Sequence, residues 1–358
     1  MKEAIGLNPN LTVLKLGYND FGDAGVATIA MGFTEGDRHH QSLSALDLGF
    51  NSIGDDGCAT LALHAVAGNE TLNTLFLSGN NIGEKGVVAI AGAILHGGGL
   101  RSLHLSANKV GTTGVQILAR AIAERESHVP NVQEGMKRPR TMEQLHLSGT
   151  QIGSQGFVTI PSMLLTNASM RVLGLANNEL DDNDIALLAQ SLSRNKSVPL
   201  EILQLSFNLI TCVGVECIMN AVWASKTLRE LRFDNNRIRD RGAQLAAVAL
   251  TSIDLELIDI SFNKVTSVGI KAMMKSLSEN STIRHLGLSG IPVDLNAAKA
   301  LSYGLAYNST LTTLNIDSCS IGYSAQRHLV AGIVSNRYAA LKILTGFNIG
   351  GEYRYAFG

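Results

Sequence analysis

The sequence predicts an α/β solenoid, a stack of similar units with parallel strands on its concave side and helices on its convex side. Three observations predict this class. One phrase of leucines, an asparagine and a glycine recurs along nearly the whole chain. Inside the phrase, buried and exposed positions alternate as they do in a strand. After the phrase, apolar residues follow at helical spacing. We therefore expect one strand and one helix in each unit.

The phrase consists of leucine, two residues, leucine, one residue, leucine, two residues, asparagine, one residue, one apolar residue that is usually aliphatic, and glycine. Successive copies begin 27 to 32 residues apart, except for one interval of 42 residues, and a period of this length is typical of a repeat architecture. The eleven copies and a degenerate twelfth begin at Leu11, Leu43, Leu72, Leu100, Met142, Met170, Leu200, Leu228, Leu255, Ile283, Leu311 and Leu341.

Each part of the unit has a physical role. In the first copy Leu14 and Leu16 flank Lys15, which is the pattern of a strand with one buried face. The asparagine side-chain amide can form hydrogen bonds with neighbouring backbone groups. A column of asparagines can therefore supply partners for the backbone N–H and carbonyl groups of the turns. Val26 and Ile29 then mark the helix. One unit cannot bury its apolar face alone, and we therefore expect residues 1–358 to form a single stacked domain.

Curvature follows from the sizes of the two elements. Neighbouring parallel strands lie about 4.8 Å apart, whereas packed helices need about 8–10 Å. The strands must therefore line the inside of an arc and the helices its outside.

The unit, written L-x-x-L-x-L-x-x-N-x-I-G-x-x-G, resembles the ribonuclease-inhibitor type of leucine-rich repeat. Ribonuclease inhibitors, the sensing domains of NOD-like receptors and Ran GTPase-activating proteins share that type. The resemblance covers nearly the entire chain and implies a leucine-rich-repeat horseshoe. It does not decide the function, because one fold hosts many functions.

Several copies depart from the pattern. Asp181 and Asp184 replace glycines in the sixth copy, and Ile291 and Cys319 stand in the asparagine column of the last two. Asparagine-to-cysteine exchange in this column is a variation of the family, so the resemblance implies a structural Cys319.

The array begins in the middle of a repeat, as the tail of a helix. We therefore expect the chain to be part of a longer protein. In that case Ile5, Leu11 and Leu14 should be more exposed than their central counterparts Leu103 and Leu145.

Composition limits the class of partner and the compartment. The formal net charge is -1, so the overall electrostatic potential of the protein does not favour binding to nucleic acid or to an anionic membrane. Four cysteines without a C-x-x-C pair favour a reducing environment. The longest apolar stretch, Gly86 to Leu95, is about half of what a membrane span needs. We expect a soluble cytoplasmic protein that binds neither nucleic acid nor membranes.

The long interval reflects an insertion at residues 124–141 in the fourth repeat, which ends in the basic run Lys137-Arg138-Pro139-Arg140. We interpret it as a solvated loop that tolerates insertion. A partner contact and a nuclear-import signal are the alternatives.

The candidate binding site is the outward face of the strands. One residue between the second and third leucine of each copy has no role in the core, and recognition is its most plausible use. With Asp234, which lies two places further along the eighth copy, the candidates on this concave face are Lys15, Asp47, Phe76, His104, His146, Gln204, Arg232, Asp259 and Asn315.

Signals for catalysis and for metals are weak. His104 and His146 fall side by side on adjacent strands, but their neighbours Phe76 and Gly174 supply no further zinc ligands. The run beginning at His96 imitates an oxyanion-hole motif, yet the chain has no G-x-S-x-G sequence and no phosphate-binding G-x-x-x-x-G-K-[ST]. We expect no catalytic residue, no cofactor and no metal site.

The sequence therefore predicts a non-catalytic protein–protein interaction module, a scaffold, inhibitor or sensor that binds a macromolecular partner on its concave face. Arginines of the eighth copy leave a GTPase-activating protein of the Ran type as an alternative, and the ligand-sensing repeat domain of a NOD-like receptor is another. Interface energy concentrates in aromatic and arginine anchors, so we expect Phe76 and Arg232 to contribute most.

Overall fold

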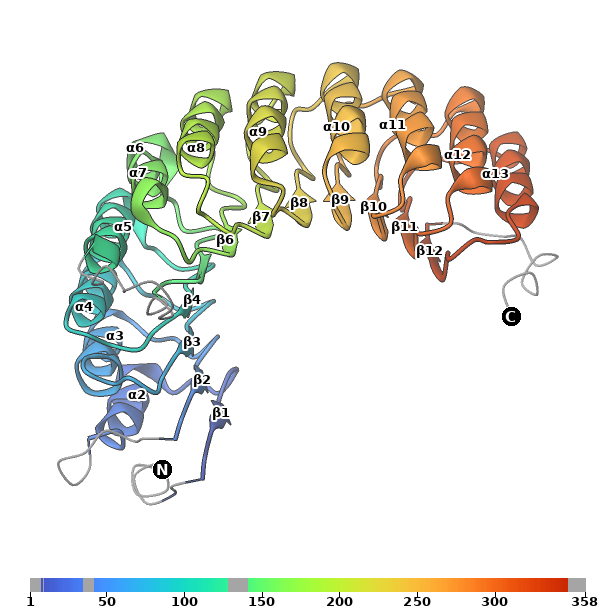
Figure 1. Cartoon of the computed structure of the whole chain (residues 1–358). Coiled ribbons are helices and arrows are strands. Elements are labelled where there is room, and N and C mark those ends of the chain that lie inside the picture. Colours follow the sequence, from blue (N-terminus) through green and yellow to red (C-terminus); the bar gives the residue numbers. More distant parts are fainter. Residues whose placement is uncertain (1–7, 9, 35–41, 128–140, 347–358) are drawn as a thin grey trace. The chain divides into compact units, whose positions relative to one another are not determined.

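The computed structural model describes residues 8, 10–34, 42–127 and 141–346. The chain divides into two compact units, of which unit 1 comprises Met1–Leu180 with Gln190–Leu200 and unit 2 comprises Asp181–Ala189 with Glu201–Gly358. Each unit is a stack of strand–helix repeats (Figure 1). That residues 1–358 form a single domain stays a prediction.

Unit 1 contains six short strands and the helices that connect them. The strands are β1 (Val13–Lys15), β2 (Ala45–Asp47), β3 (Thr74–Phe76), β4 (Ser102–His104), β5 (Gln144–His146) and β6 (Val172–Gly174). The helices are α2 (Gly22–Met31), α3 (Asp55–Leu61), the π-helical turn η1 (Ala62–Val66), α4 (Glu84–Leu95), α5 (Gly111–Ser127), α6 (Gly153–Phe157) and α7 (Thr159–Thr166).

Unit 2 repeats the same alternation, and the boundary between the units falls within helix α8 (Asp182–Arg194). Its strands are β7 (Ile202–Gln204), β8 (Glu230–Arg232), β9 (Leu257–Asp259), β10 (His285–Gly287), β11 (Thr313–Asn315) and β12 (Ile343–Thr345). Its other helices are α9 (Cys212–Ser225), α10 (Asp240–Ser252), α11 (Ser267–Glu279), α12 (Leu295–Tyr307) and α13 (Tyr323–Ser335).

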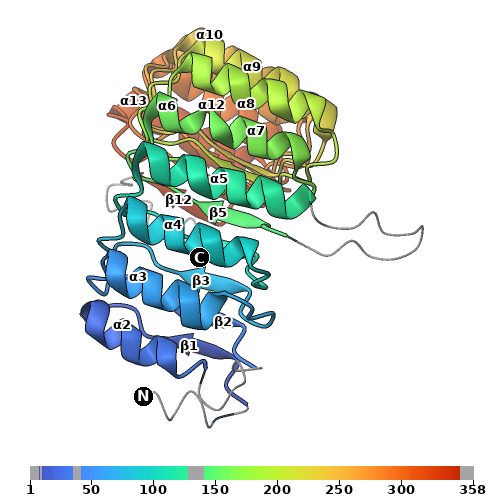
Figure 2. The ribbon, with the colours of Figure 1, turned by 90° about the vertical axis from the view of Figure 1, so that its left-hand side faces the viewer.

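Within each unit the strands are parallel and follow one another in chain order. The helices of a unit lie along the other side of its strands, and Figure 2 shows α2 to α5 of unit 1 in successive rows. The predicted α/β leucine-rich-repeat solenoid is confirmed, including a strand in the degenerate twelfth copy.

The core of each unit lies between strands and helices. The central leucine of each strand is fully buried in the inner copies, for example Leu75, Leu103 and Leu145 in unit 1. Helix residues such as Ile90 and Leu118 cover them from the other side. Burying one such side chain stabilises the fold by about 1.5–3 kcal/mol, so the recurring leucines account for the main cohesive force.

A ladder of buried asparagines joins consecutive repeats after the strands. Asn80 accepts hydrogen bonds at Oδ1 from the backbone N–H groups of Asn51 and Ile53, at 2.9 and 3.0 Å. Its Nδ2 donates to the carbonyl oxygens of Leu48 and Leu77, at 3.1 and 2.8 Å. The amide thus satisfies backbone groups of its own repeat and of the preceding one, as the sequence predicts.

Two of the copies that lack this asparagine carry a hydroxyl or thiol donor in its place, whereas the tenth copy carries the buried apolar side chain of Ile291. Thr150 donates from its hydroxyl to the carbonyl of Leu147 at 2.6 Å. The Cys319 thiol is buried and donates to the carbonyl of Leu288 at 3.2 Å. Burial raises the pKa of the Cys319 thiol. The structural role predicted for Cys319 is confirmed.

The two aspartates of the sixth copy begin helix α8. Asp181 Oδ1 accepts hydrogen bonds from the N–H groups of Asn183 and Asp184, at 2.8 and 3.1 Å. Asp184 Oδ2 accepts a bond from the N–H of Asp181 at 3.0 Å. The carboxylates therefore satisfy N–H groups of the first helical turn, which have no partner inside the helix.

Aspartates at the starts of helices form a further set of links between repeats. Asp240 Oδ1 accepts from the N–H groups of Thr266 and Gly269 in the next repeat, at 2.8 and 3.0 Å. Its Oδ2 accepts from the Thr266 hydroxyl at 2.8 Å. Partial burial by itself raises the pKa of Asp240, but these hydrogen bonds outweigh it, and the net pKa lies below the ordinary 3.8.

The insertion differs from the predicted loop at both ends. Residues 124–127 continue helix α5, and the Glu126 carboxylate is 1% exposed. Glu126 accepts hydrogen bonds from the Thr141 hydroxyl and from the N–H of Ala168. A carboxylate buried at this depth needs such donors, and they hold the two ends of the insertion together. Residues 128–140, with the basic run, lie outside the described residues.

The first strand is less covered than the central ones. Leu11 and Leu14 are partly exposed, whereas Leu103 and Leu145 are fully buried, as predicted. Ile5 lies outside the described residues. None of the helices in the described ranges reaches the length and apolarity that a membrane crossing needs.

Removing one ladder amide should destabilise the protein strongly. Asn80→Ala leaves buried backbone groups of two repeats without partners, and we expect a loss of about 2–4 kcal/mol in the free energy of unfolding. Asn81→Ala, at the exposed next position, is the control and should change stability by less than about 0.5 kcal/mol. Urea unfolding followed by circular dichroism measures both. Equal stability of the two variants would contradict the role of the ladder.

The Asp240 link should make stability depend on acid pH. Because the folded-state pKa lies below the unfolded value, the stabilisation is present above about pH 4 and is lost as the pH falls through the folded pKa. Asp240→Asn should lower the melting temperature at pH 7, and the difference from the unmodified protein should shrink below about pH 4. Asp56→Asn, at an exposed first-turn aspartate, is the control and should show a smaller effect. A pH-independent difference for Asp240→Asn would contradict this explanation.

Candidate functional site

The predicted outward residues form one line in each unit. In unit 1 the strand register places Lys15 beside Asp47, Asp47 beside Phe76, Phe76 beside His104, and His104 beside His146. In unit 2 it places Gln204, Arg232, Asp259, Gly287 and Asn315 in order. We call these lines the unit 1 column and the unit 2 column. The prediction that these residues share one face is confirmed within each unit.

Alternation along each strand explains why these side chains face outward. Leu75 points into the core and is fully buried, and the next residue, Phe76, lies half-buried on the opposite face. The same relation holds for Leu103 and His104. The column residues are therefore free of core packing and rest on a rigid backbone.

Three rings stack along the unit 1 column. The centroids of Phe76 and His104 lie 4.1 Å apart with planes at 26°, and those of His104 and His146 lie 4.1 Å apart with planes at 11°. The strand spacing imposes this close approach, since adjacent outward side chains start about 4.8 Å apart. The result is a continuous flat surface of aromatic and imidazole rings.

A hydrogen-bonded serine fixes the middle ring. Ser102 Oγ lies 3.0 Å from His104 Nε2 and donates to Gln144 Oε1 at 3.2 Å. Ser102 thereby links the His104 ring to Gln144 on the neighbouring strand.

The charge state of the stack follows from its environment. Burial, together with the nearby His146, lowers the pKa of His104 to about 4. Burial also lowers the pKa of His146. Among the residues that the structure describes, no group of three His, Cys, Asp or Glu side chains is placed to hold a metal ion. The paired histidines are therefore part of a neutral surface in this structure.

The unit 2 column has a different character. Arg232 forms an ion pair with Glu230 of its own strand, at 3.9 Å. Asp259 accepts from the N–H of Ser261 at 2.9 Å, and Asp234 accepts from the Ser206 hydroxyl and from Asn235 Nδ2. Hydrogen bonds to nearby residues hold these carboxylates in position. The Arg232 side chain remains partly exposed.

The strand face has no hollow at Gly287, although this residue has no side chain of its own. The Asp259 carboxylate occupies this space, and a Cβ atom on Gly287 would collide with it. The surface at β10 is therefore carboxylate rather than bare backbone.

Sequence reasoning missed two further sets of residues on this side. The first residue of each strand also faces outward, and it includes Ser102, Gln144 and Glu230, which contact the predicted site residues. The period-2 alternation of the strand was the signal for this set, since positions two apart share a face.

The second missed set consists of aromatic residues in the turns after the strands. Tyr18 and Phe50 stack with ring centroids 4.4 Å apart. Phe207 and Phe262 occupy the equivalent position of their repeats in unit 2. All four are at least 48% exposed and have φ between 54° and 62°, which bulky residues seldom adopt. Their signal is an aromatic residue just before the ladder asparagine.

The arginines of the eighth copy are largely engaged in ion pairs. Arg229 lies 3.6 Å from Asp254, and Arg241 lies 3.8 Å from Glu216. With the Arg232–Glu230 pair, they form a salt-bridged surface.

Comparison with known proteins agrees with this geometry. The family model described as a leucine-rich repeat matches residues 7–30, 39–62, 68–91, 100–119, 224–245, 251–274 and 307–324. The structure of the Rad7 and Elc1 complex in yeast superposes with a TM-score of 0.53 at 16% identity, over 85% of this chain and 75% of that chain. That likeness concerns the fold alone.

Two groups of curated relatives share the repeat. Ribonuclease inhibitor of Sus scrofa is 26% identical over 160 residues, which is 44% of this chain and 35% of that protein. NACHT, LRR and PYD domains-containing protein 12 of Homo sapiens is 24% identical over 289 residues, 80% of this chain and 23% of the relative. The chain thus spans about a third or less of the relatives' own length. Together with the repeat phrase and the parallel strands, these matches identify the chain as a leucine-rich-repeat protein of the ribonuclease-inhibitor type.

Proposed function

We propose that this protein is a non-catalytic protein–protein interaction module that binds a macromolecular partner through its strand face. The observation that carries the proposal is the three-ring stack of Phe76, His104 and His146. It lies on the outward side of a rigid sheet, where the rings add nothing to the core. Exposed aromatic surface on a rigid support is typical of a binding site.

The two columns suit different parts of a partner. The unit 1 column offers Lys15 and Asp47 beside the neutral ring stack, so apolar contact would dominate there. The unit 2 column offers Gln204, Arg232, Asp234, Asp259 and Asn315, which suit polar and charged groups. Electrostatic complementarity contributes specificity and association rate more than raw affinity.

The exposed turn aromatics extend this surface. Tyr18 and Phe50 present two stacked, exposed rings, and their left-handed backbone costs about 1–2 kcal/mol per residue. The same backbone conformation recurs in the turns of other copies, for example at Ala107 and Asn177, so it belongs to the repeat, and the exposed rings are what distinguishes these turns. The proposed binding surface therefore comprises the columns and the adjoining turns.

A partner that is a protein is supported by the relatives, since a ribonuclease inhibitor is named for acting on a ribonuclease. We also propose a cytoplasmic location, for which four free thiols in the described residues are the support. Whether the module acts as scaffold, inhibitor or sensor depends on the partner. Affinity purification of the full chain with mass spectrometry identifies that partner.

Phe76 and Arg232 should be the strongest single contributors to binding. Replacing either with alanine should make the free energy of binding to the purified partner less favourable by more than about 1 kcal/mol, because aromatic and arginine anchors dominate interface energy. Val88→Ala, on the outward side of helix α4, is the control and should leave the affinity unchanged. Isothermal titration calorimetry measures all three. Unchanged binding by the Phe76→Ala/Arg232→Ala double variant, with loss on deleting residues 128–140, would place the contact elsewhere.

The ring stack should stay uncharged across the physiological range. His104 should titrate at about pH 4, and His146→Gln should raise its pKa, because burial remains but a positive neighbour is removed. Since both folded pKa values lie below the unfolded value of about 6.5, the two histidines should reduce stability as the pH falls below about 6.5. NMR titration of the imidazole resonances measures the pKa values. Titration of His104 near pH 6.5 would show that its ring is solvated and charged.

A further inference from the structure

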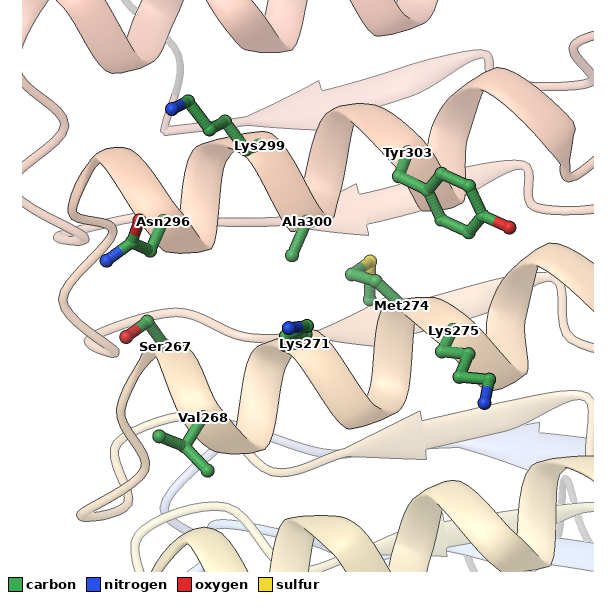
Figure 3. Close-up of a pocket in the computed structure, with 9 residues that line it drawn as sticks. All are labelled: Ser267, Val268, Lys271, Met274, Lys275, Asn296, Lys299, Ala300 and Tyr303. Atoms are coloured by element: carbon green, nitrogen blue, oxygen red, sulfur yellow. The ribbon is translucent and has the colours of Figure 1, made fainter.

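A groove lies between helices α11 and α12, on the helix side of unit 2. Its volume is about 720 Å³, within the range of ligand-binding clefts. Figure 3 shows Ala300 of α12 and Met274 of α11 pointing toward each other across it, with the Tyr303 ring at one end. Its lining includes Val268, Lys271, Met274, Lys299, Ala300 and Tyr303.

Small residues on α12 create this groove. Gly304 lets the two helices approach, and a Cβ atom there would lie 3.0 Å from the Met274 sulfur. One turn earlier, Ala300 is too short to fill the space above Met274 (Figure 3). The floor is therefore apolar, and Val268 and Tyr303 extend it with side chains that are 55% and 52% exposed.

The rim of the groove is cationic. Lys271, Lys275 and Lys299 are exposed, and none forms an ion pair with another residue in the part of the chain that the structure describes. In the whole of α11, α12 and α13 the only acidic residue is Glu279. Charge on this surface is therefore not compensated locally.

The cations recur at one position of the repeat. Lys271, Lys299 and Arg327 each stand sixteen residues after the start of their copy, on α11, α12 and α13. In the other eight full copies this position holds no basic residue. Those residues are Ala27, Ala59, Val88, Gln116, Val158, Ala186, Glu216 and Gln244. Three consecutive helices thus carry a line of equivalent positive charges that the rest of the array lacks.

The spacing of this line restricts what can bind it. Packed helices lie about 8–10 Å apart, and an extended peptide advances about 3.3 Å per residue. A chain that crosses the three helices would therefore meet one cation at about every third residue. The groove lies between the first two cations, where an apolar side chain of the same peptide can enter.

We propose that the outer faces of α11, α12 and α13 bind an acidic peptide segment of a partner protein. The segment lies extended across the helices, with a carboxylate at about every third residue for Lys271, Lys299 and Arg327. A large apolar side chain between the first two carboxylates occupies the groove over Met274. This site is distinct from the strand face and does not depend on the function proposed for it.

The form of the site favours a peptide over an anionic membrane. Val268 and Tyr303 project outward, as apolar side chains of a membrane-binding surface do, but the floor of the groove at Met274 and Ala300 is recessed and has room for an inserted side chain. A single apolar side chain flanked by carboxylates matches both the hollow and its rim.

The experiment measures binding of a fluorescein-labelled synthetic peptide by fluorescence anisotropy. The peptide has Glu at every third position and Leu or Phe between them. We expect saturable binding that weakens as salt is raised, because exposed charges are screened. Lys271→Glu/Lys299→Glu should raise Kd more than about tenfold. Lys85→Glu, at an exposed lysine on helix α4, is the matched control and should leave Kd unchanged.

Two comparisons test the geometry. A peptide of the same composition with its Glu residues adjacent should bind more weakly. Ala300→Leu, which fills the groove without changing charge, should also weaken binding, and circular dichroism checks that each variant is folded. Absence of peptide binding, or equal binding by Lys271→Glu/Lys299→Glu, would overturn the proposal. So would full binding by Ala300→Leu. Binding of phosphatidylserine vesicles through the same lysines, without peptide binding, would assign the surface to membranes instead.

Discussion

The side-chain amide after each strand is the interaction on which the repeat depends. A turn as tight as this one leaves backbone N–H and carbonyl groups inside the protein, and unpaired groups of that kind are costly. Asn80 pairs such groups in two successive repeats at once. The leucines supply most of the cohesive free energy, but the amide specifies how one repeat sits on the next. That fixed registry is what brings column residues into line.

The fold was predictable because its determinants are periodic. The repeat phrase predicted the strands, the columns and the asparagine ladder, and the family resemblance implied the structural role of the Cys319 thiol. Helix length was less predictable. The continuation of α5 through Glu126 depends on a buried carboxylate and its partners across the insertion, which no local pattern reports.

The candidate site was predictable in position and not in detail. Alternation placed Phe76, His104 and His146 side by side, but the stacking of their rings and the contact of His104 with Ser102 depend on rotamers. The position of the Asp259 carboxylate over Gly287 also depends on a side-chain rotamer. The groove between α11 and α12 arises from the difference between Ala300 and Met274 across two helices. Such contacts join residues that a single-repeat pattern treats separately.

The hydrogen bonds of the buried Glu126 carboxylate bear on how the protein tolerates a change in the length of the insertion. Its carboxylate ties Thr141 and Ala168 to the end of α5, so the two ends of the insertion are joined by described residues alone. We therefore expect the repeats on either side to keep their contacts when the sequence between Ser127 and Thr141 is lengthened, shortened or exchanged. In that case the fourth repeat is a place where a reporter or an epitope can be grafted.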